Sequence, residues 1–144
     1  MPRPQDYATH RRYFPLYHFV VLPALVVNFV WSVRHAMGSP DAWNIWTAVM
    51  AFVLVLFALA ARVMALAVQN RVIRLEMRLR FGALLPPALA ARAAGLSTRQ
   101  VVALRFAGDA ELPPLVERCL AGEFAAPKDI KLAIRDWQPD WLRA

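Results

Sequence analysis

Apolar residues form two long blocks in the first half of the chain, with charged residues gathered between and after them. The first block also contains Pro15, His18, Pro23 and Asn28. The blocks cover residues 14–33 and 42–61, and the second contains no charged side chain. Each matches the roughly 20 apolar residues that a helix needs to cross a bilayer. The connection, residues 34–41, ends in Gly38-Ser39-Pro40-Asp41, which is typical of a tight turn, and Asp41 can cap the following helix. The pattern therefore predicts a transmembrane helical hairpin.

The second helix should continue well past the apolar block, because no proline or glycine occurs between Ala42 and Gly82. Beyond the block, apolar residues recur at alternating spacings of four and three, as in a coiled-coil seam. These residues are Ala61, Ala65, Val68, Val72, Leu75 and Leu79. The stripe is either a partner-binding seam or a surface that packs against the chain's own C-terminal helices.

Basic residues accompany the stripe and also precede the first block. The chain has a formal net charge of +7, and a chain this apolar and this basic indicates an anionic membrane surface before it indicates nucleic acid. We expect the arginines to contact anionic lipid headgroups or an acidic partner surface. They are Arg11, Arg12, Arg62, Arg71, Arg74, Arg78 and Arg80.

The segment after Pro86-Pro87 reads as short helices separated by turns. We expect helices over residues 87–94, from Ser97 or Thr98 to about Ala107, and over residues 109–121. A last helix should begin at Pro127 and extend to Trp137. The predicted fold is thus an all-α membrane protein. Residues 1–13 form a cytoplasmic segment, residues 14–85 the hairpin with its extended second helix, and residues 86–144 a small helical domain.

The distribution of basic residues predicts the orientation. Of the 17 Lys and Arg residues, three precede Phe14, one lies in the connection and the other thirteen follow Ala61. The positive-inside rule then places both termini in the cytoplasm of a bacterial inner membrane. Arg11-Arg12 before an apolar block also resembles a twin-arginine export signal. The long block, the second span and the absence of a small-residue cleavage site argue against export.

Little in the sequence indicates catalysis. No nucleophile–base set, phosphate-binding loop or metal-ligand spacing is visible, and the single cysteine, Cys119, suits a buried helix position. We predict no enzyme activity, no bound metal, no resident cofactor and no nucleic-acid partner. The alternative is a haem- or pigment-binding protein, with His18 or His35 as the candidate ligand near the membrane.

Several segments resemble an uncharacterised family of small bacterial two-span membrane proteins. They are the opening His10-Arg11-Arg12-Tyr13-Phe14-Pro15-Leu16-Tyr17-His18-Phe19, the segment from Gln69 to Arg80, Leu104-Arg105-Phe106-Ala107, and Pro127-Lys128-Asp129-Ile130-Lys131 with Trp137. The resemblance implies the hairpin and the helical C-terminal domain, and it implies no activity.

The expected function is that of a non-enzymatic accessory subunit. Such a subunit would pack against and stabilise a larger inner-membrane assembly, by analogy a respiratory or photosynthetic complex. Its partners would be membrane lipids and other membrane protein subunits. A homo-oligomeric membrane anchor or sensor that works through the stripe from Ala61 to Leu79 is a further alternative.

Overall fold

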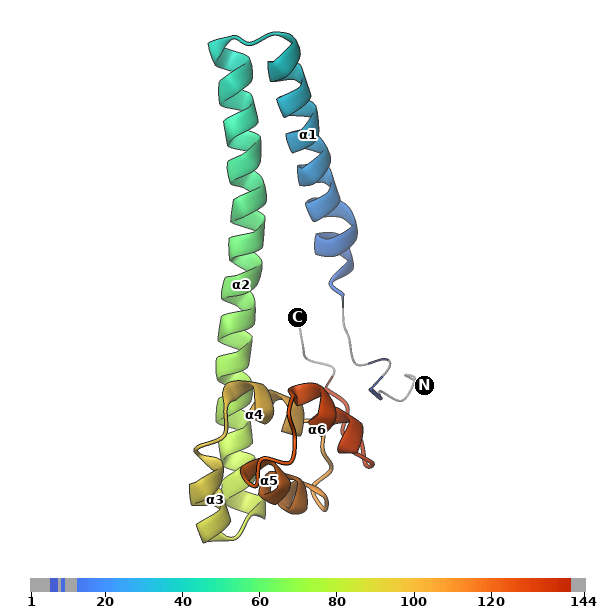
Figure 1. The fold of residues 1–144 in the computed structure, drawn as a ribbon, viewed down its shortest axis with the longest axis vertical. Helices are drawn as coiled ribbons and strands as arrows, with labels where there is room; N and C mark the ends of the chain where they lie inside the picture. Colours follow the sequence, from blue (N-terminus) through green and yellow to red (C-terminus); the bar gives the residue numbers. More distant parts are fainter. Residues whose placement is uncertain (1–5, 8, 10–12, 141–144) are drawn as a thin grey trace. The chain divides into compact units, whose positions relative to one another are not determined.

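The computed structural model describes residues 6, 7, 9 and 13–140, and the described residues contain six α-helices (Figure 1). A π-helical turn, η1 (Leu16–Val21), precedes α1 (Leu22–Gly38), and α2 (Ala42–Leu84) follows. The chain divides into two compact units within α2. We call Tyr13–Ala67 the hairpin unit, and we call the part of the chain from Val68 onward the helical unit.

Proline explains the π-helical start of the hairpin unit. Pro23 has no backbone N–H, and its ring clashes with the carbonyl four residues earlier in a regular helix. Widening the preceding turn relieves that clash. The Leu22 N–H accordingly donates to the Tyr17 carbonyl, five residues back.

The connection between the two long helices is shorter than the sequence predicted. α1 continues through Arg34 and His35 to Gly38, because nothing before the Gly38-Ser39-Pro40 sequence interrupts its hydrogen bonds. The predicted cap is confirmed, since Asp41 Oδ1 accepts from the Asn44 N–H at 2.8 Å. The Asn44 side-chain amide in turn donates to the Ser39 carbonyl at 2.8 Å.

Small residues form the contact between the two helices of the hairpin unit. Ser32, Ala51 and Ala58 are its buried residues, and all three are small. The Tyr17 hydroxyl donates to the Ala58 carbonyl at 2.9 Å, and the rings of Phe29 and Phe52 lie 5.4 Å apart. The large apolar side chains point outward instead. Leu16–Gly38 and Ala42–Leu84 are both long and apolar enough to cross a membrane.

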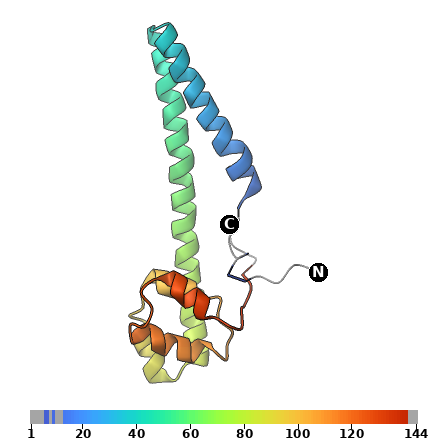
Figure 2. The same ribbon diagram turned by 45° about the vertical axis from the view of Figure 1, so that its right-hand side comes forward.

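The helical unit packs four short helices against the last turns of α2 (Figures 1 and 2). These are α3 (Pro87–Ala93), α4 (Thr98–Leu104), α5 (Leu112–Leu120) and α6 (Pro127–Ala133). α2 and the residue after it supply Ile73, Met77, Phe81 and Leu85 to the core. Leu104, Leu112, Val116 and Ile130 from the short helices are fully buried around them.

Local sequence signals set most of the helix ends in this unit. Ser97 and Gln100 form a reciprocal capping box at the start of α4. Gly122 follows α5 with a φ of +76°, a conformation that glycine adopts without strain. The Asp129 carboxylate accepts from the Ala126 N–H at 2.9 Å and so caps α6.

Three of the predicted helices are too long. The helix predicted over residues 109–121 begins only at Leu112, after a turn at residues 109–111. α4 ends at Leu104 rather than near Ala107, and α6 ends at Ala133 rather than at Trp137. The reason is a tertiary contact, an isolated antiparallel bridge between Ala107 and Trp137. It is extended by hydrogen bonds from Gly108 N to Asp136 O (2.8 Å) and from Gln138 N to Phe106 O (2.7 Å).

Aromatic stacking and close backbone packing stabilise this bridge. The rings of Phe106 and Trp137 stack at 4.7 Å, and the Arg105 guanidinium lies 4.2 Å from the centre of the Phe106 ring. Gly108 lies close to the Asp136 side chain, which would have to shift to admit a β-carbon at this position. The segment after α6 therefore serves as a short extended strap across the α4–α5 connection.

Candidate interaction surfaces

Four members of the predicted stripe form an exposed apolar ridge on the helical unit. Val68, Val72, Leu75 and Leu79 keep 64%, 48%, 54% and 77% of their surface accessible, and we call these four residues the outer ridge. The side of α2 that packs into the core carries Ile73, Met77 and Phe81 instead. The two expectations for the stripe therefore divide between its residues: these four are exposed, whereas Ile73 and Met77, which widen the stripe, pack against the short helices. Ala61 and Ala65, in the hairpin unit, are also exposed.

Three arginines lie beside the outer ridge. Arg71, Arg74 and Arg78 are exposed, and among the described residues their side chains make no hydrogen bond or ion pair. At 100° per residue they occupy one flank of the ridge, while Glu76 occupies the other. The structure thus places an apolar strip between a basic flank and a single acid.

The other predicted arginines have different surroundings. Arg62 lies in the hairpin unit with its guanidinium 6.0 Å from the centre of the Tyr17 ring. Arg11 and Arg12 lie outside the described residues.

Arg80 has a structural role that its sequence context does not reveal. Its side chain is 17% exposed, and its Nη2 lies 2.6 Å from Asp109 Oδ1. The guanidinium also donates to the carbonyls of Arg105 and Ala107. A planar guanidinium suits this arrangement because it offers several donors in fixed directions. Arg80 therefore fastens the α4–α5 connection to α2.

The polar residues of α1 face two different environments. Ser32 is buried, whereas Asn28 is exposed, although it lies within the 23-residue apolar helical segment from Leu16 to Gly38. Among the described residues, Asn28 forms no side-chain hydrogen bond. Asn28 lies one turn before the buried Ser32 on α1, so its amide is exposed at the edge of the contact between the two helices.

The two candidate histidines do not form a common site. They are 17 residues apart along the helical segment, which corresponds to about 25 Å. His18 Nδ1 lies 3.1 Å from the amide nitrogen of Phe14 and 3.0 Å from its carbonyl oxygen, so that ring nitrogen already has local partners. His35 is exposed on the last turns of α1.

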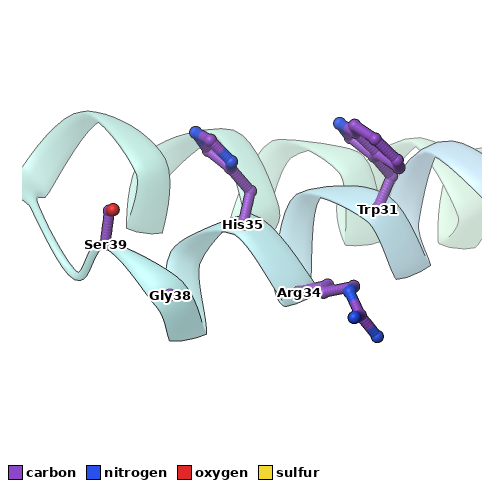
Figure 3. A pocket seen from close by; sticks show the side chains of 5 residues that line it. All are labelled: Trp31, Arg34, His35, Gly38 and Ser39. Carbon is purple, nitrogen blue, oxygen red and sulfur yellow. The ribbon is translucent and has the colours of Figure 1, made fainter.

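His35 lines a shallow hollow of about 260 Å³ at the end of α1 (Figure 3). Trp31 and His35 point to the same side of the helix, and Arg34 points to the other side. The remaining lining residues are Gly38 and Ser39. One exposed imidazole beside one indole is a weak basis for a haem or pigment site, since the second axial position has no candidate in this hollow.

The helical unit contains a second hollow, of about 430 Å³, between α5 and α6. Glu111 is the acidic residue that lines it. Its carboxylate already accepts hydrogen bonds from the backbone N–H groups of Gly108, Arg135 and Asp136. The described residues contain no cluster of three His, Cys, Asp or Glu side chains that could hold a metal ion.

The thiol of Cys119 has low reactivity. It is buried on α5, and desolvation raises the pKa of its thiol to about 11. Since the thiolate is the reactive form, the native thiol is a poor nucleophile near neutral pH.

Comparison with known proteins gives a family and no function. No curated protein and no solved structure matches the chain. One family model matches residues 1–144, and its description is a family of unknown function (DUF6526). That match covers the whole sequence, so the chain belongs to this family of unknown function, DUF6526.

Proposed function

We propose that this chain is a non-enzymatic integral membrane subunit whose hairpin packs against the transmembrane helices of other proteins in a larger inner-membrane assembly. The observation that carries the proposal is Asn28, an exposed primary amide within the first apolar block, about one turn before Trp31. In hydrocarbon an amide without a hydrogen-bonding partner is costly. Transmembrane helices commonly satisfy such groups across a helix–helix interface.

The side-chain distribution of the hairpin unit supports the membrane placement. Its contact buries serine and alanine, while phenylalanine, valine and leucine face outward, for example Phe57 at 70% exposed and Val27 at 66%. In water such a surface would be an extensive apolar patch, which soluble monomers avoid. In lipid it is the expected arrangement, because small residues drive close helix packing and large apolar residues meet the acyl chains.

The basic residues support an orientation with both termini in the cytoplasm. The turn around Ser39 carries Arg34 as its only nearby arginine, and thirteen of the 17 Lys and Arg residues follow Ala61. Trp31, Trp43 and Trp46 are exposed near the turn, as in the aromatic belt at a membrane interface.

Substitution of Asn28 tests the proposal. We expect wild-type protein, extracted in mild detergent, to migrate with other membrane proteins in one complex. Asn28→Leu should release it from that complex, and Asn28→Gln should retain it because the amide is kept. Val27→Leu is the matched control, since Val27 is adjacent, exposed and apolar.

Two results would contradict the proposal. One is wild-type protein that purifies in mild detergent with no other chain in stoichiometric amount. The other is an Asn28→Leu variant that keeps the complex as fully as Val27→Leu does.

A further inference from the structure

The outer ridge has the composition of a two-stranded coiled-coil seam. Val68 and Leu75 occupy d positions, and Val72 and Leu79 occupy a positions, of three successive heptads. All four side chains are about half exposed or more. A β-branched residue at a with leucine at d, as in Val72 and Leu75, favours two parallel strands.

The charged residues on the flanks of the ridge fit a second copy of the same chain. In this register Arg71 and Arg78 fall at g, and Glu76 falls at e. Across a parallel pair, a g residue faces the e residue five positions further along the partner helix. Arg71 therefore faces Glu76 of the second copy, and two-fold symmetry makes this pair twice.

The remaining charges also favour the parallel orientation. Arg78 faces the neutral Ala83 in this register, and Arg74, at c, points away from the partner helix. An antiparallel pair would instead set g residues against g residues and so bring arginines together, at an electrostatic cost.

We propose that the outer ridge is a self-association surface, through which two copies of this chain pair in parallel with Arg71 of each facing Glu76 of the other. The inference uses a different face from the one that contains Asn28. It rests on the membrane placement proposed above, which gives both copies the same orientation.

Four core residues per copy make a short seam, which alone would contribute little to the stability of a dimer. Two features of the chain compensate for this short length. The opposite face of α2 packs against the helical unit, so the helix exists before the copies meet and association orders little new backbone. Anchoring both copies in one bilayer also raises their effective concentration and aligns their helices.

Disulfide cross-linking in native membranes tests the pairing. Cys119 is first replaced by alanine so that one introduced cysteine remains. Leu75→Cys, on the ridge, should give a band at twice the mass of the chain upon mild oxidation. Arg74→Cys is the matched control, exposed and adjacent but directed away from the seam, and we expect at least tenfold less dimer from it.

A charge exchange in the Leu75→Cys background tests the identity of the partner. Arg71→Glu or Glu76→Arg alone should lower the cross-linked fraction severalfold, because each sets like charges together. The double variant Arg71→Glu/Glu76→Arg should restore it. Both residues are exposed and make no side-chain hydrogen bond or ion pair among the described residues, so these variants leave the fold intact.

Three outcomes would overturn the inference. They are the absence of a dimer from Leu75→Cys in intact membranes, equal dimer from Arg74→Cys, and a double exchange that fails to restore cross-linking. The last would identify the occupant as a different chain. Failure of the Asn28 experiment leaves the cross-linking result unchanged, so the two proposals fail separately.

Discussion

The two units of this protein bury opposite kinds of side chain. The hairpin unit buries Ser32, Ala51 and Ala58 and exposes large apolar residues along both helices. The helical unit buries Phe106, Leu104, Leu112, Ile130 and Val116, as a water-soluble domain does. The same chain therefore follows two packing rules, and the change falls within one continuous helix, α2.

The difference supports the proposed placement of the hairpin unit in a membrane and of the helical unit in water. In water, large apolar side chains are buried by the hydrophobic effect. In lipid they remain in contact with the acyl chains, and helices associate through the packing of small residues. The outer ridge departs from this pattern in the helical unit, because its four apolar residues are exposed rather than buried. That exception is what makes the ridge a candidate interface.

The strongest test of the comparison removes a large side chain from the helical core. Leu104 is completely buried, so Leu104→Ala should destabilise the helical unit by about 2–5 kcal/mol through lost transfer energy and a residual cavity. Leu132→Ala, at a leucine that is 56% exposed, should change stability by less than about 0.5 kcal/mol. Hydrogen exchange of amides in α4 and α5 measures both. Equal effects would show that this unit has no core of the kind described.

The second test places a charge on equally apolar surfaces of the two units. Leu54 is 45% exposed in the middle of the second apolar block, and Leu54→Arg should cost about 2.5–3.5 kcal/mol of membrane insertion. Leu132→Arg, on the surface of the helical unit, should have no effect on insertion and little on folding. A membrane-insertion assay that reports the inserted fraction compares them, and equal tolerance would argue against a lipid environment for Leu54.

The third test compares an arginine held by hydrogen bonds with an arginine that is exposed. Arg80→Met removes the donors to two carbonyls and to Asp109, so it should destabilise the helical unit by about 1–3 kcal/mol. Arg78→Met is the control, because Arg78 is exposed and makes no side-chain hydrogen bond among the described residues. Chemical denaturation in detergent, followed by the fluorescence of Trp137 in a background whose other four tryptophans are replaced by phenylalanine, should distinguish them. Identical midpoints would contradict the role assigned to Arg80.

The smallest expected effect concerns pH. Burial raises the pKa of Cys119 from 9.0 to about 11, so the folded state disfavours the thiolate. Between about pH 9 and 11 the unfolded chain loses this proton and the folded chain keeps it, so the stability of the helical unit should fall as pH rises. Cys119→Ala should remove this part of the pH dependence. A thiol that reacts rapidly at pH 8 without unfolding would contradict the burial of Cys119.

The sequence predicted the elements that local signals specify. The two apolar blocks and the cap at Asp41 each depend on a few neighbouring residues, and the cap predicted at Ser97 or Thr98 is at Ser97. The long α2 follows from the lack of any helix breaker before Gly82. The extended segment around Trp137 was missed, because its partner at Ala107 lies 30 residues earlier and no local pattern marks the bridge.

The candidate surfaces were predictable only in part. The stripe was visible in the sequence as a heptad pattern. The sequence did not show whether the stripe or the adjacent Ile73 and Met77 would pack into the core, and the structure buries Ile73 and Met77. Arg80 looked like the other arginines until the fold placed Asp109 beside it. The five-residue spacing from Arg71 to Glu76 is present in the sequence. It indicates a pair between two copies only because the structure exposes the outer ridge between these residues.

The most direct test of the central claim, that the hairpin crosses a membrane with its turn outside, is cysteine accessibility in intact cells. Ser39→Cys in the turn and Arg99→Cys on α4, each in a Cys119→Ala background, would be exposed to a membrane-impermeant maleimide. The account predicts that Ser39→Cys is labelled from outside and that Arg99→Cys is labelled only after permeabilisation. Labelling of Arg99→Cys in intact cells, or protection of Ser39→Cys, would contradict it.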